Sequence, residues 1–179
     1  MLRDARPLLA VGALVRYLDT PAGAYREVAG ALLLLRRGRL WTHVLHMGVD
    51  SPASLAAGRA NWALPKVACR FEQEDERTLA LGSGWRVAVW ARARGPALPL
   101  AAPAPALLQV AARGLLRAGL HARAGTRPAW VRVEAHGEAA GQVPAGARPG
   151  LALSSGALWI GPGRVIGDHR PVSSAPPGG

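Results

Sequence analysis

Short segments with the composition of β-strands recur along this chain, and glycine, proline or charged residues separate them. Turns such as Arg36–Arg39 and Gly82–Gly84 end one segment and let the chain reverse into the next. This spacing predicts a mainly β (α+β) fold: an antiparallel β barrel or cone, or a double sheet, with a few flanking helices. The expected strands are Leu8–Tyr17, Ala29–Leu35, Leu40–Val49, Ala68–Glu72, Thr78–Leu81, Trp85–Ala91, Trp130–Ala135 and Leu158–Ile166.

One helix is well signalled between the third and fourth expected strands. Asp50 or Ser51 can cap it, and Ala53–Asn61 is rich in helix-forming residues and contains no β-branched one. Because the residue before a proline is driven out of the helical region, the helix should end just before Pro65. Lys66 then lies immediately after a helix, at the start of the next strand.

The middle of the chain is ambiguous. Within Leu98–Arg123, some apolar residues recur at helical spacing and others alternate as in a strand. The Ala- and Pro-rich stretch Pro96–Pro105 has the composition of a connector. We expect a single domain over residues 1–168, followed by a flexible Pro/Ser/Gly tail over residues 169–179, whose composition offers little apolar surface to bury.

The formal net charge of +11 raises the possibility of an acidic or nucleic-acid partner. The arginines are nevertheless spread along the chain and cluster only at Arg36, Arg37 and Arg39. Few aromatic residues lie among them to stack on bases. We therefore expect no nucleic-acid partner, although a basic protein that binds an acidic partner stays open as an alternative.

Cysteine and hydropathy patterns indicate the compartment. Cys69 is the single cysteine, which excludes an internal disulfide and favours a reducing, cytoplasmic environment. The apolar run Pro7–Val15 is far too short to cross a bilayer and fits a strand better, so we expect no membrane association.

His43 and His46 are three residues apart on an expected strand and should face opposite sides of it. We expect no metal site and no cofactor.

Lys66 is the only lysine among 22 basic residues, and the rest are arginine. An amine can lose its proton and attack a carbonyl group, whereas a guanidinium stays protonated. Trp62, Leu64 and Val67 would surround this amine with apolar surface, which disfavours its charged form. Arg59 could act on the amine by like-charge repulsion or could hold a substrate carboxylate. A lysine that survives on the surface by chance is the alternative.

Three segments together resemble a known family. Gly58–Lys66 has the pattern G-R-x-x-W-x-L-P-K, which resembles the lysine motif of the acetoacetate decarboxylase family. Thr20–Glu27 is similar to the family's upstream motif of glycine, aromatic residue and glutamate, and Trp159–Arg164 to its late strand motif. In this order they span most of the chain, roughly Leu8–Ile166.

The resemblance implies a lysine that condenses with a carbonyl compound to an iminium, on a small β-keto acid or ketone, without a cofactor. Decarboxylation and aldol or dehydration chemistry would share the resulting enamine. It also implies a homo-oligomer. A protein that keeps the fold and binds a small ligand without catalysis is the alternative. The residues that the resemblance places in the site are Lys66 and Glu27 as catalytic groups, and Arg59, Tyr25, Trp62 and Leu64 as substrate-binding groups.

Two features depart from the family pattern. Val67 stands where the decarboxylase carries a second lysine, so a neighbouring ammonium is lost. The family's longer members also carry an N-terminal arginine in the pocket, and this chain begins too late to include it. Arg26, Arg59 or Arg164 could replace that arginine, and the sequence does not select among them.

Overall fold

The computed structural model describes residues 2, 4–74 and 76–166 of the chain, so the tail expected over residues 169–179 lies outside the described residues. Ten strands form one strongly curved sheet, and a single α-helix lies beside it in the described part. The elements are β1 (Ala5–Tyr17), β2 (Tyr25–Arg36), β3 (Arg39–Val49), α1 (Pro52–Trp62), β4 (Lys66–Glu74), β5 (Arg77–Gly82), β6 (Trp85–Ala93), β7 (Leu98–Ala111), β8 (Gly114–Gly137), β9 (Gly146–Ile160) and β10 (Arg164–Ile166).

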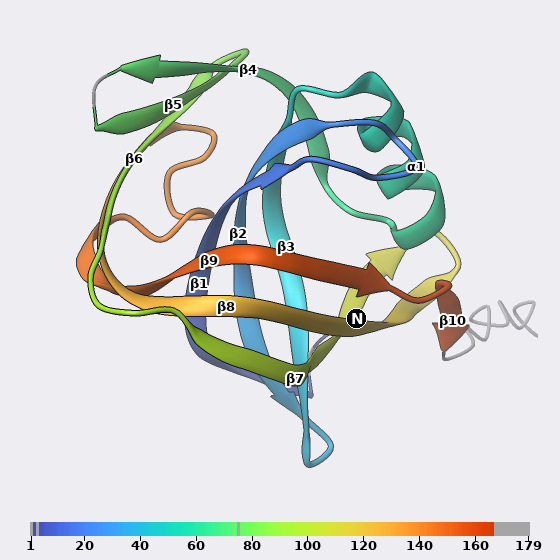
Figure 1. The fold of residues 1–179 in the computed structure, drawn as a ribbon. Coiled ribbons are helices and arrows are strands. Elements are labelled where there is room, and N and C mark those ends of the chain that lie inside the picture. The colour runs from blue at the N-terminus through green and yellow to red at the C-terminus, as the bar shows by residue number, and fades with distance from the viewer. Residues whose placement is uncertain (1, 3, 75, 167–179) are drawn as a thin grey trace, which may run out of the picture.

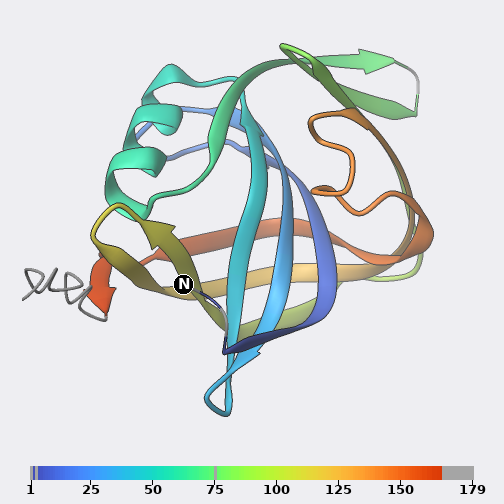
Figure 2. The ribbon, with the colours of Figure 1, turned by 180° about the vertical axis from the view of Figure 1, so that it is seen from behind.

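The sheet folds over itself into two layers. β8 and β9 cross in front of β1, β2 and β3 in Figure 1, and Figure 2 shows the same crossing from behind. Most neighbouring strands are antiparallel, as expected, but β3 pairs in parallel with β4 at one end and with β7 at the other. The sheet therefore closes on itself at β3: the path of paired strands that starts at β3 returns to it through β4, β5, β6, β8 and β7. The mainly β fold is confirmed, and the expected few helices reduce to α1 in the described part.

The apolar core lies between the two layers. One group of buried side chains, here called the inner cluster, comes from strands of both layers and from the segment after α1. Burial of such a cluster is the main stabilising contribution of a fold of this kind. Its buried members are Ala29, Ala31, Val44, Met47, Val49, Leu64, Leu107 and Ala118.

The helix begins and ends where the sequence predicts. Ser51 is its N-cap, and the Ser51 hydroxyl accepts a hydrogen bond from the Ser54 backbone N–H at 3.2 Å. At the other end, Ala63 adopts a left-handed conformation with φ of 51°, and its N–H donates to the Arg59 carbonyl. The chain then turns through Pro65 into β4, which starts at Lys66.

The connector expected at Pro96–Pro105 is wrong, because β7 starts at Leu98 and pairs along its length with β8. Strands accept proline where no ladder hydrogen bond needs its nitrogen. β7 offers such positions because, in the described residues, only Ala106 and Leu107 pair on its second side, with β3. The ambiguous region Leu98–Arg123 forms β7 and the first part of β8, which pair with each other, and contains no helix. The strand expected over Leu158–Ile166 is interrupted between β9 and β10.

A β-bulge overturns the expected orientation of the two histidines on β3. His46 pairs with Gly30 and Val44 pairs with Ala31, so Leu45 is an extra residue in β3. His43 pairs with Leu32, and Gly30 and Leu32 share a face of β2, so the register puts both histidines on the same face. The His43 ring bonds the Leu108 carbonyl, whereas His46 packs edge-on against Trp85.

We predict that His46 makes the fold sensitive to acid. Its side chain is buried, and its Nε2 has no hydrogen-bond partner among the described residues. Burial lowers its pKa, against an opposing effect of Glu138. Because the unfolded chain then binds a proton more readily than the folded chain, the free energy of unfolding should fall as pH drops below about 6.5. Urea titrations from pH 7.5 to 5 should show a smaller fall in His46→Gln. The exposed His121→Gln is the control, and equal pH profiles for all three proteins would contradict the prediction.

Candidate functional site

The lone lysine lies inside the molecule, on the face of the sheet that carries the inner cluster. Lys66 pairs with Met47 of β3, and Met47 pairs with Ala29 of β2. Glu27 lies two residues before Ala29, so strand alternation directs its side chain to the same face. Lys66 and Glu27 are only 4% and 7% exposed, and they are the only buried lysine, arginine, aspartate or glutamate side chains in the described part of the chain.

The lysine amine is held by two hydrogen bonds and one ring. Lys66 Nζ donates to Glu27 Oε2 at 3.0 Å and to Ser54 Oγ at 2.7 Å. It also lies 5.3 Å from the centre of the Tyr25 ring. The structure thus brings together Lys66, Glu27 and Tyr25, which the sequence singled out, and adds Ser54 from the first turn of α1. The usable signal for Ser54 was its place one helical turn before Gly58 of the lysine motif.

Gly58 gives the lysine side chain room to reach this position. A Cβ atom at Gly58 would lie 2.5 Å from Lys66 Cε and 2.6 Å from Lys66 Cδ. The aliphatic part of the lysine therefore runs directly over the helix backbone at Gly58, towards Ser54 one turn earlier. This close approach is the physical reason for a glycine in the G-R-x-x-W-x-L-P-K pattern.

We predict that Gly58→Ala displaces the amine without unfolding the protein. Alanine is the better helix former by about 1 kcal/mol, and the obstructing atoms belong to a flexible side chain. Reaction of Lys66 with a carbonyl probe should nevertheless slow by about 10²-fold, because shifts near 1 Å in a catalytic group cost about that much. Mass spectrometry of adduct formation and a thermal melt measure the two effects. Gly119→Ala is the matched control, because its Cβ would meet nothing closer than 3.9 Å, and full reactivity of Gly58→Ala would contradict the assignment.

Two tyrosines complete the polar group around the amine. Tyr17 of β1 pairs with Tyr25 of β2, and their ring centres are 4.6 Å apart. Burial, followed by the charge of Glu27, raises the pKa of Tyr17, whose hydroxyl donates a hydrogen bond to that carboxylate. Burial also raises the pKa of Tyr25, against a lowering effect of its hydrogen bond with Ser54. Both phenols thus stay protonated at neutral pH. No sequence motif indicated Tyr17.

The other residues of the lysine motif hold the backbone around the site. Arg59 is exposed, and its Nε donates to the Lys66 carbonyl at 2.8 Å. Trp62 donates from its indole N–H to the Gly161 carbonyl at 2.9 Å, which joins the late strand motif to the helix. Leu64 is buried in the inner cluster, against which Trp62 also packs. The Arg59 guanidinium is therefore engaged by the backbone of Lys66.

The upstream motif also meets the helix. The Arg26 backbone N–H donates to Asp50 Oδ1 at 2.7 Å, just before the helix starts. The Asp50 N–H in turn donates to the Arg26 carbonyl, which ties the first residues of β2 to the end of β3. The three motifs, separated in the sequence by up to about 130 residues, therefore meet around Lys66.

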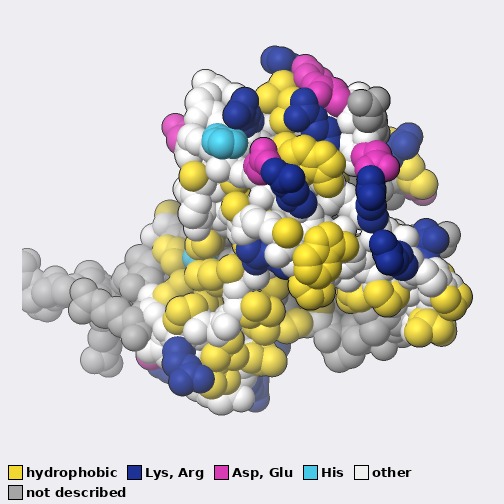
Figure 3. All heavy atoms as spheres, turned by 90° about the vertical axis from the view of Figure 1, so that its left-hand side faces the viewer, with side chains coloured by type: hydrophobic (Ala, Val, Ile, Leu, Met, Phe, Trp, Pro, Cys, Tyr) yellow, Lys and Arg dark blue, Asp and Glu magenta, His cyan; other side chains and the backbone are white. Residues whose placement is uncertain are grey.

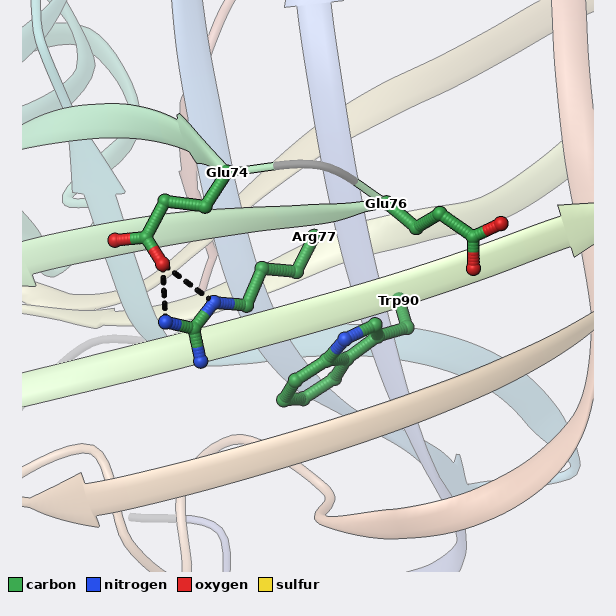
Figure 4. A pocket seen from close by; sticks show the side chains of 4 residues that line it. All are labelled: Glu74, Glu76, Arg77 and Trp90. Carbon is green, nitrogen blue, oxygen red and sulfur yellow. Dashed lines mark hydrogen bonds and ion pairs between the residues drawn. The ribbon is translucent and has the colours of Figure 1, made fainter.

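A hollow lies on the surface, away from Lys66, at the hairpin of β4 and β5. Glu74, Glu76, Arg77 and Trp90 line it, and Figure 4 shows the ion pair between Glu74 and Arg77. The Arg77 guanidinium also lies over the Trp90 ring, and Arg92 pairs with Glu76. These charges satisfy one another, which is typical of a solvated surface rather than a ligand site.

Basic and acidic side chains are neighbours on this side of the molecule. Figure 3 shows dark blue cations beside magenta anions, with hydrophobic side chains between them. The ion pairs include Arg70 with Glu72 and Arg132 with Glu134. On this face, the mixed charge differs from the continuous basic stripe on which nucleic-acid binding depends. In the described residues, no three His, Cys, Asp or Glu side chains gather to hold a metal ion. No described helix is long and apolar enough to cross a membrane.

Comparisons by sequence and by structure give different results. No family model matches the sequence, and no curated protein matches it significantly. The structure is similar to acetoacetate decarboxylase from Legionella pneumophila subsp. pneumophila str. Philadelphia 1, with 15% identity and a TM-score of 0.68 over 93% of this chain and 78% of that chain.

Two further structures share the fold. The enduracididine biosynthesis enzyme MppR, complexed with pyruvate, is 11% identical, with a TM-score of 0.59 over 82% of this chain and 68% of that chain. An acetoacetate decarboxylase-like enzyme from Sphingomonas wittichii RW1 is 16% identical, with a TM-score of 0.53 over 82% of this chain and 70% of that chain. The chain therefore has the fold of acetoacetate decarboxylase and of the enzymes that resemble it.

Proposed function

We propose that this protein is a Schiff-base-forming lyase that acts through Lys66 on a small β-keto acid or ketone. The observation that carries the proposal is the buried pair of Lys66 and Glu27, with Nζ and Oε2 3.0 Å apart. Burial of an ion pair rarely improves stability over apolar side chains of the same volume. An amine beside a proton acceptor, in an apolar surrounding, is instead the arrangement that imine chemistry needs.

The reaction uses the pair without changing its net charge. Glu27 takes a proton from the Lys66 ammonium, and the neutral amine attacks the carbonyl carbon, so that an N–C bond forms and the carbonyl electrons move to oxygen. Glu27 returns the proton to this oxygen, which becomes a hydroxyl group, and then carries a second proton to it from the attached nitrogen. The C–O bond breaks, and water leaves. The products are a protonated imine on Lys66 and an ionised Glu27.

The iminium then accepts electrons from the neighbouring bond. From a ketone, Glu27 removes an α-proton and an enamine forms; from a β-keto acid, loss of carbon dioxide gives the same enamine. Protonation of the enamine and addition of water reverse the condensation and release the product. The Ser54 hydroxyl lies 2.7 Å from the amine, at a position suited to the oxygen that leaves as water, and the Tyr25 ring lies beside it.

Reductive trapping tests the proposal. The protein is incubated with a panel of small ketones and keto acids, borohydride is added, and the peptide that contains Lys66 is weighed by mass spectrometry. Hydride addition to the iminium carbon leaves a stable secondary amine. An adduct on Lys66 supports the lyase. Ligand binding in calorimetry with no adduct from any member of the panel would favour a non-catalytic binding protein instead.

We also propose that a second copy of the chain covers β1. This strand pairs only with β2 in the described residues, and Leu8, Leu9, Val11 and Leu14 on it are 38–57% exposed. Long apolar edge strands invite pairing with another chain. Light scattering after gel filtration should show an oligomer, and Leu9→Arg should shift it towards the monomer. The exposed Leu40→Arg, in the hairpin between β2 and β3, is the control, and a monomeric wild-type protein would contradict the proposal.

A further inference from the structure

The charges around Lys66 restrict which carbonyl compounds the site can accept. The buried cation Lys66 is balanced by the buried anion Glu27. No arginine of the described residues is buried. A substrate carboxylate placed beside the amine would thus meet a carboxylate of the protein and no second cation.

None of the three arginines that could supply such a cation is placed to do so. Arg26 lies between Tyr25 and Glu27 on β2, so strand alternation directs its side chain to the opposite face. Arg59 is exposed, and its Nε is bonded to the Lys66 carbonyl. Arg164 is exposed on β10.

Condensation itself does not create room for another negative charge. The ammonium of Lys66 becomes an iminium, so one cation and one anion are present before and after the step. A bound carboxylate adds a second anion in a buried, apolar setting, where an unpaired charge is strongly unfavourable. The ring of Tyr25 and the apolar side chains of Leu64 and Trp62 suit an uncharged ligand instead.

We infer that the site takes uncharged ketones or aldehydes and excludes keto acids. The inference rests on the proposed imine function of Lys66 and narrows it to aldol, retro-aldol or dehydration chemistry, in which the α-carbon loses a proton or a carbon–carbon bond breaks without release of carbon dioxide. The electrons of the broken bond enter the iminium, and Glu27 receives or returns the proton, so no oxidant or other reactant is required.

Two probes that differ in charge test whether the site excludes a carboxylate. Methyl levulinate and levulinate share the keto-acid skeleton and differ in the negative charge, and levulinate is not a β-keto acid that could decarboxylate. Both are trapped with borohydride on the whole protein, and the yield of adduct on the Lys66 peptide is measured. The ester should give at least about tenfold more adduct than the acid. Lys66→Arg is the control for adducts formed elsewhere.

A variant of Glu27 tests whether the negative charge of this residue causes the exclusion. In Glu27→Gln the site keeps its cation and loses its anion, so the ratio of ester to acid adduct should fall by about tenfold or reverse. Equal yields from the two probes in the wild-type protein, or an unchanged ratio in Glu27→Gln, would overturn the inference while the imine function stands. No adduct from either probe or from any ketone of the panel would overturn the imine function, and the inference with it.

Discussion

Replacing Lys66 by arginine should abolish imine chemistry while leaving a folded protein. The guanidinium keeps the positive charge opposite Glu27 but cannot lose a proton and attack a carbonyl carbon. The measurement is the exchange of the α-protons of a small ketone for deuterium, followed by NMR, because exchange reports formation of the enamine. The rate above background should fall by at least about 10³-fold, as is usual when a covalent catalyst is removed.

A relocated lysine provides the control for this experiment. Arg70 has a side chain that is 72% exposed and lies four residues further along β4. The double variant Lys66→Arg, Arg70→Lys therefore moves the only lysine of the chain to the surface. It should remain inactive, because an exposed amine has neither the buried carboxylate nor the apolar surrounding. Activity retained in Lys66→Arg, or recovered in the double variant, would refute the role of Lys66.

Glu27→Gln should separate imine formation from proton transfer. The amide keeps the size of the side chain and can still accept a hydrogen bond from Tyr17, but it cannot take a proton. Deuterium exchange should slow by about 10²–10⁴-fold, the usual contribution of a positioned acid–base group. A borohydride-trapped adduct should still form on prolonged incubation with a neutral ketone, because slow proton transfer through water remains available.

Glu134→Gln is the matched control for the loss of a carboxylate. Glu134 pairs with Arg132 at the surface of β8, where an ion pair contributes little to stability. Its exchange rate should equal that of the wild-type protein. An unchanged exchange rate in Glu27→Gln would show that Glu27 only balances the charge of Lys66 and that another group moves the proton.

The site also explains how imine chemistry could proceed without the second lysine of the family pattern. Val67 replaces that lysine and packs against the apolar cluster around Trp85. The groups that contact the amine are instead a carboxylate, the Ser54 hydroxyl and the ring of Tyr25. In the proposed mechanism Glu27 transfers the proton and the Tyr25 ring supplies apolar surface, so repulsion between two ammonium groups is not needed.

The Leu98–Arg123 region shows where local signals are insufficient. Its apolar residues fit both a helix and a strand, and its prolines favour a connector. β7 and the start of β8 form there because each strand pairs with the other and β7 also reaches β3. Such pairs join residues far apart in the sequence, and neither periodicity nor propensity in a short window contains that information. The bulge at Leu45 places His43 and His46 on the same face of β3 instead of on opposite faces. It too depends on pairing with a distant strand, β2.

The sequence alone determined the features that depend on neighbouring residues. These are the ends of the helix at Ser51 and before Pro65, and most of the strands. It also singled out Lys66, the only lysine of the chain. Only the tertiary structure decided which groups surround that amine. Ser54 contacts the amine, Tyr17 interacts with Glu27, and Arg59 donates a hydrogen bond to the Lys66 carbonyl. The physical reason is that capping and alternation act within a few residues, whereas strand register and burial decide which distant side chains share an interior face.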